Sequence, residues 1–273
     1  MAQNGEMVRA FNQDAMRGNS PTSQEYEQPL TERMRTFLRL EFLYQQLLYN
    51  AELEANWATR AATASLLDIV AILSRGDVRS DILKALDHNL DSLRRFQSLP
   101  EVDTSRLNSL VATLEDNRSV LQGIGNHFLQ PLKDNEFLNA IKHRSSIPGG
   151  TCEFDLPVYS HWLRLPYERR QEDFSDWLGV VRPICDAVTE LLWLVREISP
   201  RTDRRAINGM YQHAMQKNSQ CQMLRIVLPA SNRLYPEISG SHHRFTVRFM
   251  EWSAVGSRAV QTGHDVDFQL SIC

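Results

Sequence analysis

The hydrophobic period of this chain changes once, close to Pro200, and this change limits the folds that the sequence can adopt. From Pro29 onward, apolar residues recur every three or four positions, which is the spacing of amphipathic helices. After Pro200 they alternate with polar residues, a pattern typical of half-buried antiparallel strands. The sequence therefore predicts an α+β protein with a helical bundle domain and a smaller antiparallel β-sheet domain.

Domain boundaries follow from the same pattern. Residues 1–28 are rich in Gln, Asn, Ser and Gly and have no sustained period, so we expect a flexible N-terminal tail, with a short helix at Val8–Met16 as an alternative. Residues 29–199 form the predicted α-helical domain. Within it, residues 146–157 hold a Pro-Gly-Gly turn followed by weak alternation, so this stretch can contribute a strand to the sheet. Residues 200–273 form the predicted β-strand domain.

Individual elements can be predicted where the period is clear. Apolar side chains form one stripe along residues 181–198, so we expect a helix there with Pro183 in its first turn, after a separate helix over residues 167–178. Three stretches alternate clearly and a fourth less clearly, and these are the predicted strands: 224–228, 244–249, 265–272 and 205–212.

The composition excludes several classes of protein. Of the 273 residues, 42% are hydrophobic and 23% are charged, which is ordinary for a soluble domain. Uninterrupted apolar runs such as Leu191–Val195 are far shorter than the roughly 20 residues that cross a membrane. Residues 1–10 carry polar and charged side chains, unlike the apolar core of a signal peptide. We therefore expect a cytoplasmic protein that does not bind a membrane.

Sequence motifs of catalysis and of cofactor or metal binding are absent from the chain. It contains no phosphate-binding glycine loop, no dinucleotide-binding glycine pattern, no zinc-protease motif and no nucleophile elbow, so we expect neither enzyme activity nor a cofactor. The four cysteines include no C-x-x-C pair, and we interpret them as reduced thiols. His242 and His243 point to opposite faces of a strand, so at most one can join His264, Asp265 and Asp267, and we expect no metal site.

Basic residues are unevenly distributed. The formal net charge of the chain is −3, but the segment from Arg201 to Met250 has eight basic residues against two acidic ones, a local charge of +6. Of the 30 basic residues 26 are arginines. Arginine suits bidentate capture of carboxylates better than lysine does, although genome base composition can produce the same excess.

Five groups of basic residues together indicate a basic face for an acidic partner. In four of them, two residues stand one helical turn apart, two flank a Gly-Asp turn, two lie at the end of a helix, and two share one strand face. In that order they are Arg35 and Arg39, Arg75 and Arg79, Lys142 and Arg144, and Arg244 and Arg248; the fifth group is Arg201, Arg204 and Arg205, in the linker into the sheet.

Two alternatives to this basic face stay open. Each group can be ordinary solvated surface, and Arg248 can pair with Asp265 or Asp267 across the sheet. The region of residues 201–250 can also bind single-stranded nucleic acid, since Tyr211, Tyr235 and Phe245 are interleaved with its basic residues, although Phe245 alternates toward the core. No RNA-binding sequence signature supports this second reading.

Several segments of the chain resemble the ZapD family, bacterial cell-division proteins that associate with the FtsZ ring. The resemblance covers about residues 27–273. The motifs that carry the resemblance are the opening of a predicted helix, a turn, a Pro-Gly-Gly segment and stretches near the end of the chain. They are Glu27–Phe42, Arg75–Arg79, Ser146–Gly150 with Cys152 and Phe154–Pro157, Leu234–Pro236 with Ile238–Gly240, Arg244–Phe245 and Arg248–Met250. The chain departs from the family in its first 26 residues, at Ser160 and over His213–Gln222.

The resemblance implies a non-catalytic adaptor that forms a symmetric homodimer. It also implies binding to the C-terminal tail of FtsZ, cross-linking of FtsZ filaments, and localisation in the cytoplasm at the mid-cell division ring, without a nucleic-acid partner. The basic residues of the family's motifs correspond here to Arg35, Arg39, Arg75, Arg79, Lys142, Arg144, Arg244 and Arg248.

Overall fold

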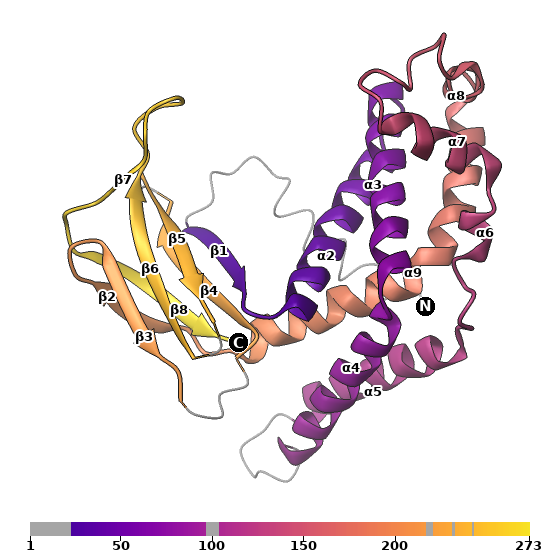
Figure 1. Ribbon diagram of the computed structural model, residues 1–273. Helices are drawn as coiled ribbons and strands as arrows, with labels where there is room; N and C mark the ends of the chain where they lie inside the picture. Colours follow the sequence, from indigo (N-terminus) through magenta and orange to yellow (C-terminus); the bar gives the residue numbers. More distant parts are fainter. Residues whose placement is uncertain (1–22, 97–103, 217–220, 231–232, 242) are drawn as a thin grey trace. The chain divides into compact units, whose positions relative to one another are not determined.

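The computed structural model describes residues 23–96, 104–216, 221–230, 233–241 and 243–273, and within them it has two compact units (Figure 1). The helical unit comprises Glu32–Ile198, and the β unit combines residues up to Thr31 with Ser199–Cys273. The chain is therefore α+β, as the change of period near Pro200 predicts.

The helical unit is built around antiparallel helices of about 20 residues and one longer helix. Its elements are α2 (Glu32–Ala51), α3 (Asn56–Arg75), α4 (Val78–Phe96), α5 (Thr104–Gly123), α6 (Gln130–Lys133), α7 (Glu136–Ser145), α8 (Pro157–Leu163) and α9 (Tyr167–Ile198). Helix α9 packs against α2, α4 and α5 through fully buried side chains such as Val181 and Ile184. Two polar contacts also join α2 to α9. Arg196 donates to both carboxylate oxygens of Glu41 at 2.7 Å, and the Tyr44 hydroxyl donates to Asp186 at 2.8 Å.

Helix α9 is continuous through Pro183, so the prediction of two separate helices, with Pro183 at the start of the second, is wrong. A proline inside a helix removes one backbone hydrogen bond and crowds the carbonyl four residues earlier. Buried side chains on both sides of the proline, among them Trp177, Leu178 and Ile184, hold the two halves on one helical stripe. Tertiary packing therefore outweighs the local cost of the proline.

The segment 146–157 contains turns and no strand, which corrects the prediction that it joins the sheet. Its backbone amides bond locally, from Gly150 to the carbonyl of Ile147 and from Leu156 to that of Cys152, both at 2.9 Å. A Cβ added at Gly150 would lie 2.4 Å from the Arg144 carbonyl oxygen, so only glycine fits this close turn.

Helix α3 is long and apolar enough to cross a membrane by composition alone, with a mean hydropathy of 1.2 over 18 residues. A search for uninterrupted apolar runs does not identify this helix, because the charged residues Arg60 and Asp68 lie within it. Half of that window is buried in the helical unit, where α3 packs against α2. Burial of this kind is typical of the core helix of a bundle.

The β unit contains two antiparallel sheets. The first has the order β1–β4–β8–β2, and in the second β6 lies between β3 and β5 and also pairs with β7. The strands are β1 (Ser23–Pro29), β2 (Thr202–Ala206), β3 (Met210–Ala214), β4 (Met223–Pro229), β5 (Leu234–Gly240), β6 (Arg244–Glu251), β7 (Val260–Gln261) and β8 (Val266–Ile272). Inward-facing residues of both sheets share one core, which includes Ile226, Phe245, Phe249 and Phe268.

Strand β1 corrects the prediction of a flexible tail through residue 28, since residues 23–29 pair with β4 along its whole length. Residues 1–22, including the suggested helix at Val8–Met16, lie outside the described residues. The predicted strand over residues 205–212 is in fact two strands, β2 and β3. They are separated by a turn in which Asn208 and Gly209 have positive φ angles of 49° and 69°.

Candidate partner-binding surfaces

The eight predicted site residues divide between the two units. Six lie on helices of the helical unit, on α2, α3, α4 and α7, and two lie on β6 of the β unit (Figure 1). Each predicted pair keeps its two members close in the chain, on one element or across one turn. The structure therefore presents four small basic groups, and each can be described within its own unit.

One member of each group already has a partner within the chain. Arg35 lies 3.4 Å from a Glu32 carboxylate oxygen, and Arg144 lies 3.7 Å from Asp155. Arg79 donates to the backbone carbonyl of Ile124, and at 3.3 Å to the side-chain oxygen of Asn126. The fourth residue with a partner in the chain is Arg248, which donates to a Glu237 carboxylate oxygen at 2.9 Å.

The side chain of the other member of each group is exposed and has no hydrogen bond or ion pair with any residue that the structure describes. These residues are Arg39, Arg75, Lys142 and Arg244. An exposed cation that no internal carboxylate neutralises can bind an external anion without first breaking a contact. Each group thus combines one cation that already interacts within the chain with one cation that is available to a partner.

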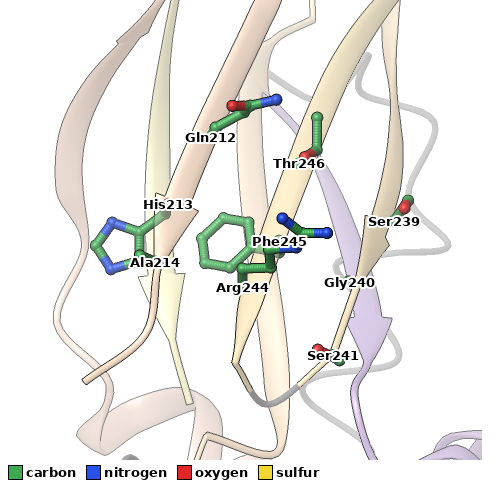
Figure 2. Close-up of a pocket in the computed structure, with 9 residues that line it drawn as sticks. All are labelled: Gln212, His213, Ala214, Ser239, Gly240, Ser241, Arg244, Phe245 and Thr246. Atoms are coloured by element: carbon green, nitrogen blue, oxygen red, sulfur yellow. The ribbon is translucent and has the colours of Figure 1, made fainter. Parts of the chain in front are cut away.

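Arg244 lines a groove formed by parts of β3, β6 and β5 in the second sheet, with a volume of about 670 Å³. Figure 2 shows its side chain on β6, with β3 residues on one side and β5 residues on the other. None of the other lining residues carries a carboxylate; they are Gln212, His213, Ala214, Ser239, Gly240, Ser241, Phe245 and Thr246. Gly240 lies directly opposite Phe245, and an added Cβ there would lie 2.6 Å from the Phe245 Cβ, so only glycine fits at this position.

The local charge of +6 in residues 201–250 is largely offset in the folded chain. Four of the seven arginines in this segment pair with carboxylates, and three of these four use acids from outside it. These three are Arg201 with Glu25, Arg205 with Asp267, and Arg225 with both Glu25 and Glu27. A count of charges along the sequence therefore overestimates the basic character of this surface.

The predicted alternative that Arg248 pairs with Asp265 or Asp267 is wrong. Asp267 accepts two hydrogen bonds from Arg205, at 2.6 and 2.7 Å, and this pairing lowers the pKa of the Asp267 carboxyl. Asp265 instead accepts from the backbone amide of Asn208 at 3.0 Å. The register of β6 places Glu237, on β5, directly opposite Arg248. Nothing in the sequence period indicates this partner, because the register depends on where the β5–β6 turn closes.

Titratable groups with shifted pKa values lie mainly in the packing of the helical unit. Burial raises the pKa of Asp186 and of Glu190, and it raises the pKa of the Cys185 thiol well above its usual range. Asp186 accepts from Tyr44 between two helices, so its environment is that of a structural contact. Within the described parts of the chain, no cluster of three or more His, Cys, Asp or Glu side chains could hold a metal ion.

These features define an α+β protein of two units whose distinctive surface features are charged side chains. A sequence model described as "ZapD: Cell division protein" matches residues 38–248, which indicates a role in cell division. Cell division protein ZapD of Methylococcus capsulatus is 36% identical over 248 residues, covering 91% of this chain and 97% of that protein. Proteins of the same name from Escherichia coli O1:K1 and Shigella boydii serotype 18 are each 35% identical over 251 residues, covering 91% of this chain and 98% of theirs. The chain belongs to the ZapD family.

Proposed function

We propose that this protein is a non-catalytic adaptor that binds the acidic C-terminal tail of FtsZ and cross-links FtsZ filaments at the mid-cell ring. The observation that carries the proposal is the set of four exposed cations whose side chains have no hydrogen-bond or ion-pair partner among the residues that the structure describes, Arg39, Arg75, Lys142 and Arg244. Carboxylates of an acidic tail would supply the missing counter-charges. The family to which the chain belongs has a role in cell division, which agrees with such a partner.

Cross-linking needs two binding surfaces in one particle. A single protomer with one binding surface can only decorate a filament, whereas a twofold-symmetric homodimer carries two copies of that surface and gains avidity. We therefore include homodimerisation in the proposed function. No catalytic step is required, since filament bundling results from binding alone.

Single-stranded nucleic acid is the weaker candidate partner. Stacking on bases requires exposed aromatic rings beside free cations. Tyr211 is instead half-buried inside the β unit, where its ring contacts that of Phe268 edge to face with 5.3 Å between the ring centroids. Carboxylates already neutralise Arg201, Arg205, Arg225 and Arg248.

Binding of a fluorescein-labelled FtsZ tail peptide, measured by anisotropy, tests the proposal against an oligonucleotide of 20 deoxythymidines. We expect the peptide to bind, and we expect Arg39→Gln, Arg75→Gln, Lys142→Gln and Arg244→Gln each to weaken it by about three- to tenfold. Arg258→Gln is the matched control, because Arg258 is exposed and has no partner among the described residues but lies outside the four groups. Binding of the oligonucleotide without the peptide would overturn the proposal.

A further inference from the structure

Arg248 and Glu237 are directly opposite each other in the β5–β6 ladder, and their side chains form an ion pair at 2.9 Å. Both are about half exposed, at 51% and 45% of the side-chain surface. Solvent reaches this pair, so an incoming carboxylate can compete with Glu237 for the Arg248 guanidinium. Exposed pairs of this kind change equilibrium constants by roughly 1.4- to 5-fold.

Arg244, on the same face of β6, has a different environment. Its neighbour on β3 is Ala214, directly opposite in the ladder, and the β5 side of its groove is formed by Ser239, Gly240 and Ser241. Among the described residues none supplies a carboxylate to it. The two arginines are four residues apart, about 13 Å along an extended strand. One strand face therefore carries a free arginine and an occupied arginine within reach of a single extended peptide.

We propose that Glu237 is an intramolecular competitor that lowers the affinity of the β6 face for acidic peptides and makes Arg244 the dominant contact. This inference rests on the proposed function, in which the β6 face binds an acidic tail. Binding of a carboxylate at Arg244 breaks no ion pair among the described residues. A carboxylate that binds at Arg248 must displace Glu237, and it then stays close to the negative charge of Glu237. Glu237 thus sets the affinity of this face for acidic peptides, although its own negative charge repels them.

The proposal predicts a specific pattern among four variants. Glu237→Gln removes the competing charge and keeps the side chain's size, so it tightens peptide binding by roughly two- to fivefold. In the wild-type chain Arg244→Gln weakens binding more than Arg248→Gln does. When Glu237→Gln is also present, the loss caused by Arg248→Gln increases and becomes similar to that caused by Arg244→Gln. This non-additivity measures the coupling between Glu237 and Arg248 directly.

The matched control is Glu251→Gln, on the neighbouring strand β6, which changes the net charge of the same sheet by the same amount. Glu251 is exposed, lies opposite Leu234 and Val260, and has no ion pair with the described part of the chain. It should leave peptide affinity nearly unchanged. Equal effects of Glu237→Gln and Glu251→Gln, or no effect of Glu237→Gln, would overturn the proposal and leave only a general change of charge.

Two probes separate this inference from the proposed function. Anisotropy titrations in about 50 mM salt use the labelled FtsZ tail peptide and, independently, a labelled hexaglutamate peptide, with thermal melting of each variant as the folding control. If hexaglutamate shows the expected pattern and the FtsZ peptide does not bind, the competitor role holds and the FtsZ proposal fails. If the FtsZ peptide binds but Glu237→Gln has no effect on either probe, the competitor role fails and the FtsZ proposal stands. Absence of binding to both probes would overturn both.

Discussion

At the scale of single residues, equal formal charges behave differently because their surroundings differ. Arg225 is nearly buried, with 8% of its side chain exposed, and two carboxylates from β1 surround it. Arg244 is exposed and has none among the described residues. The first arginine joins two strands and contributes to folding, while the second is available to a ligand. Burial and the register of neighbouring strands, rather than residue type, decide between these roles.

Glu190 shows how burial of a single carboxyl changes stability with pH. Burial, and next the charge of Asp186, raise the pKa of Glu190 above its ordinary value of 4.5. The folded state therefore binds a proton more readily than the unfolded state, and its stability falls as pH rises from about 4.5 through the raised pKa. We expect Glu190→Gln to raise the melting temperature at pH 8 and to lose this advantage at pH 4.

Melting curves measured by circular dichroism between pH 4 and pH 8 check this prediction. Asp176→Asn removes the carboxyl charge at an exposed position on the same helix, so it is the control and should not raise the melting temperature at pH 8. A Glu190→Gln chain that melts below the wild type at pH 8 would show that the ionised carboxylate contributes a favourable contact.

At the scale of secondary-structure elements, β1 is the element that links distant parts of the sequence. Its seven residues pair with β4, about 200 positions later in the chain, and Glu25 bridges Arg201 and Arg225. Only Tyr26 in the sequence SQEYEQP is a large apolar residue, so no clear alternation marks this strand. The strand is stabilised by its backbone pairing with β4 and by the ion pairs of Glu25, and the strand propensities of its residues indicate neither.

Two truncations separate β1 from the residues before it. Removal of residues 1–22 should leave the free energy of unfolding unchanged. Removal of residues 1–29 should lower the stability of the β unit by about 3 kcal/mol or more, because Arg225 then stays buried without either carboxylate. Urea unfolding followed by circular dichroism measures both. Equal stability of the two shortened chains would show that β1 contributes little to the β unit.

At the scale of the whole molecule, the proposed bundling depends on assembly and on long-range charge. Sedimentation at micromolar concentration should give twice the chain mass of 31.4 kDa, since bridging requires two copies of each surface. Raising salt from about 50 to 300 mM shortens the Debye length from about 14 to about 6 Å, so filament bundling should weaken.

Light scattering of FtsZ filaments across this salt range, together with the double variant Arg39→Glu and Arg244→Glu, tests the electrostatic mechanism. The variant should stay folded and dimeric but lose bundling, because both positions are exposed cations without internal partners in the described chain. Wild-type bundling by the double variant, or by a monomer, would contradict the mechanism.

The sequence by itself determined the α+β class, the position where helices give way to strands, the ZapD family, and the places of the four basic groups. These features depend on local periodicity and on motifs that are contiguous in the chain. Only the tertiary structure decided that residues 23–29 are a strand, that α9 continues through Pro183, and that Arg248 pairs with Glu237 while Arg244 has no side-chain partner in the described parts of the chain. Each of these depends on which distant residues meet, as when Glu25 meets Arg225 or Glu237 lies opposite Arg248. Strand register and core packing set those encounters, and a one-residue shift in register would change every partner.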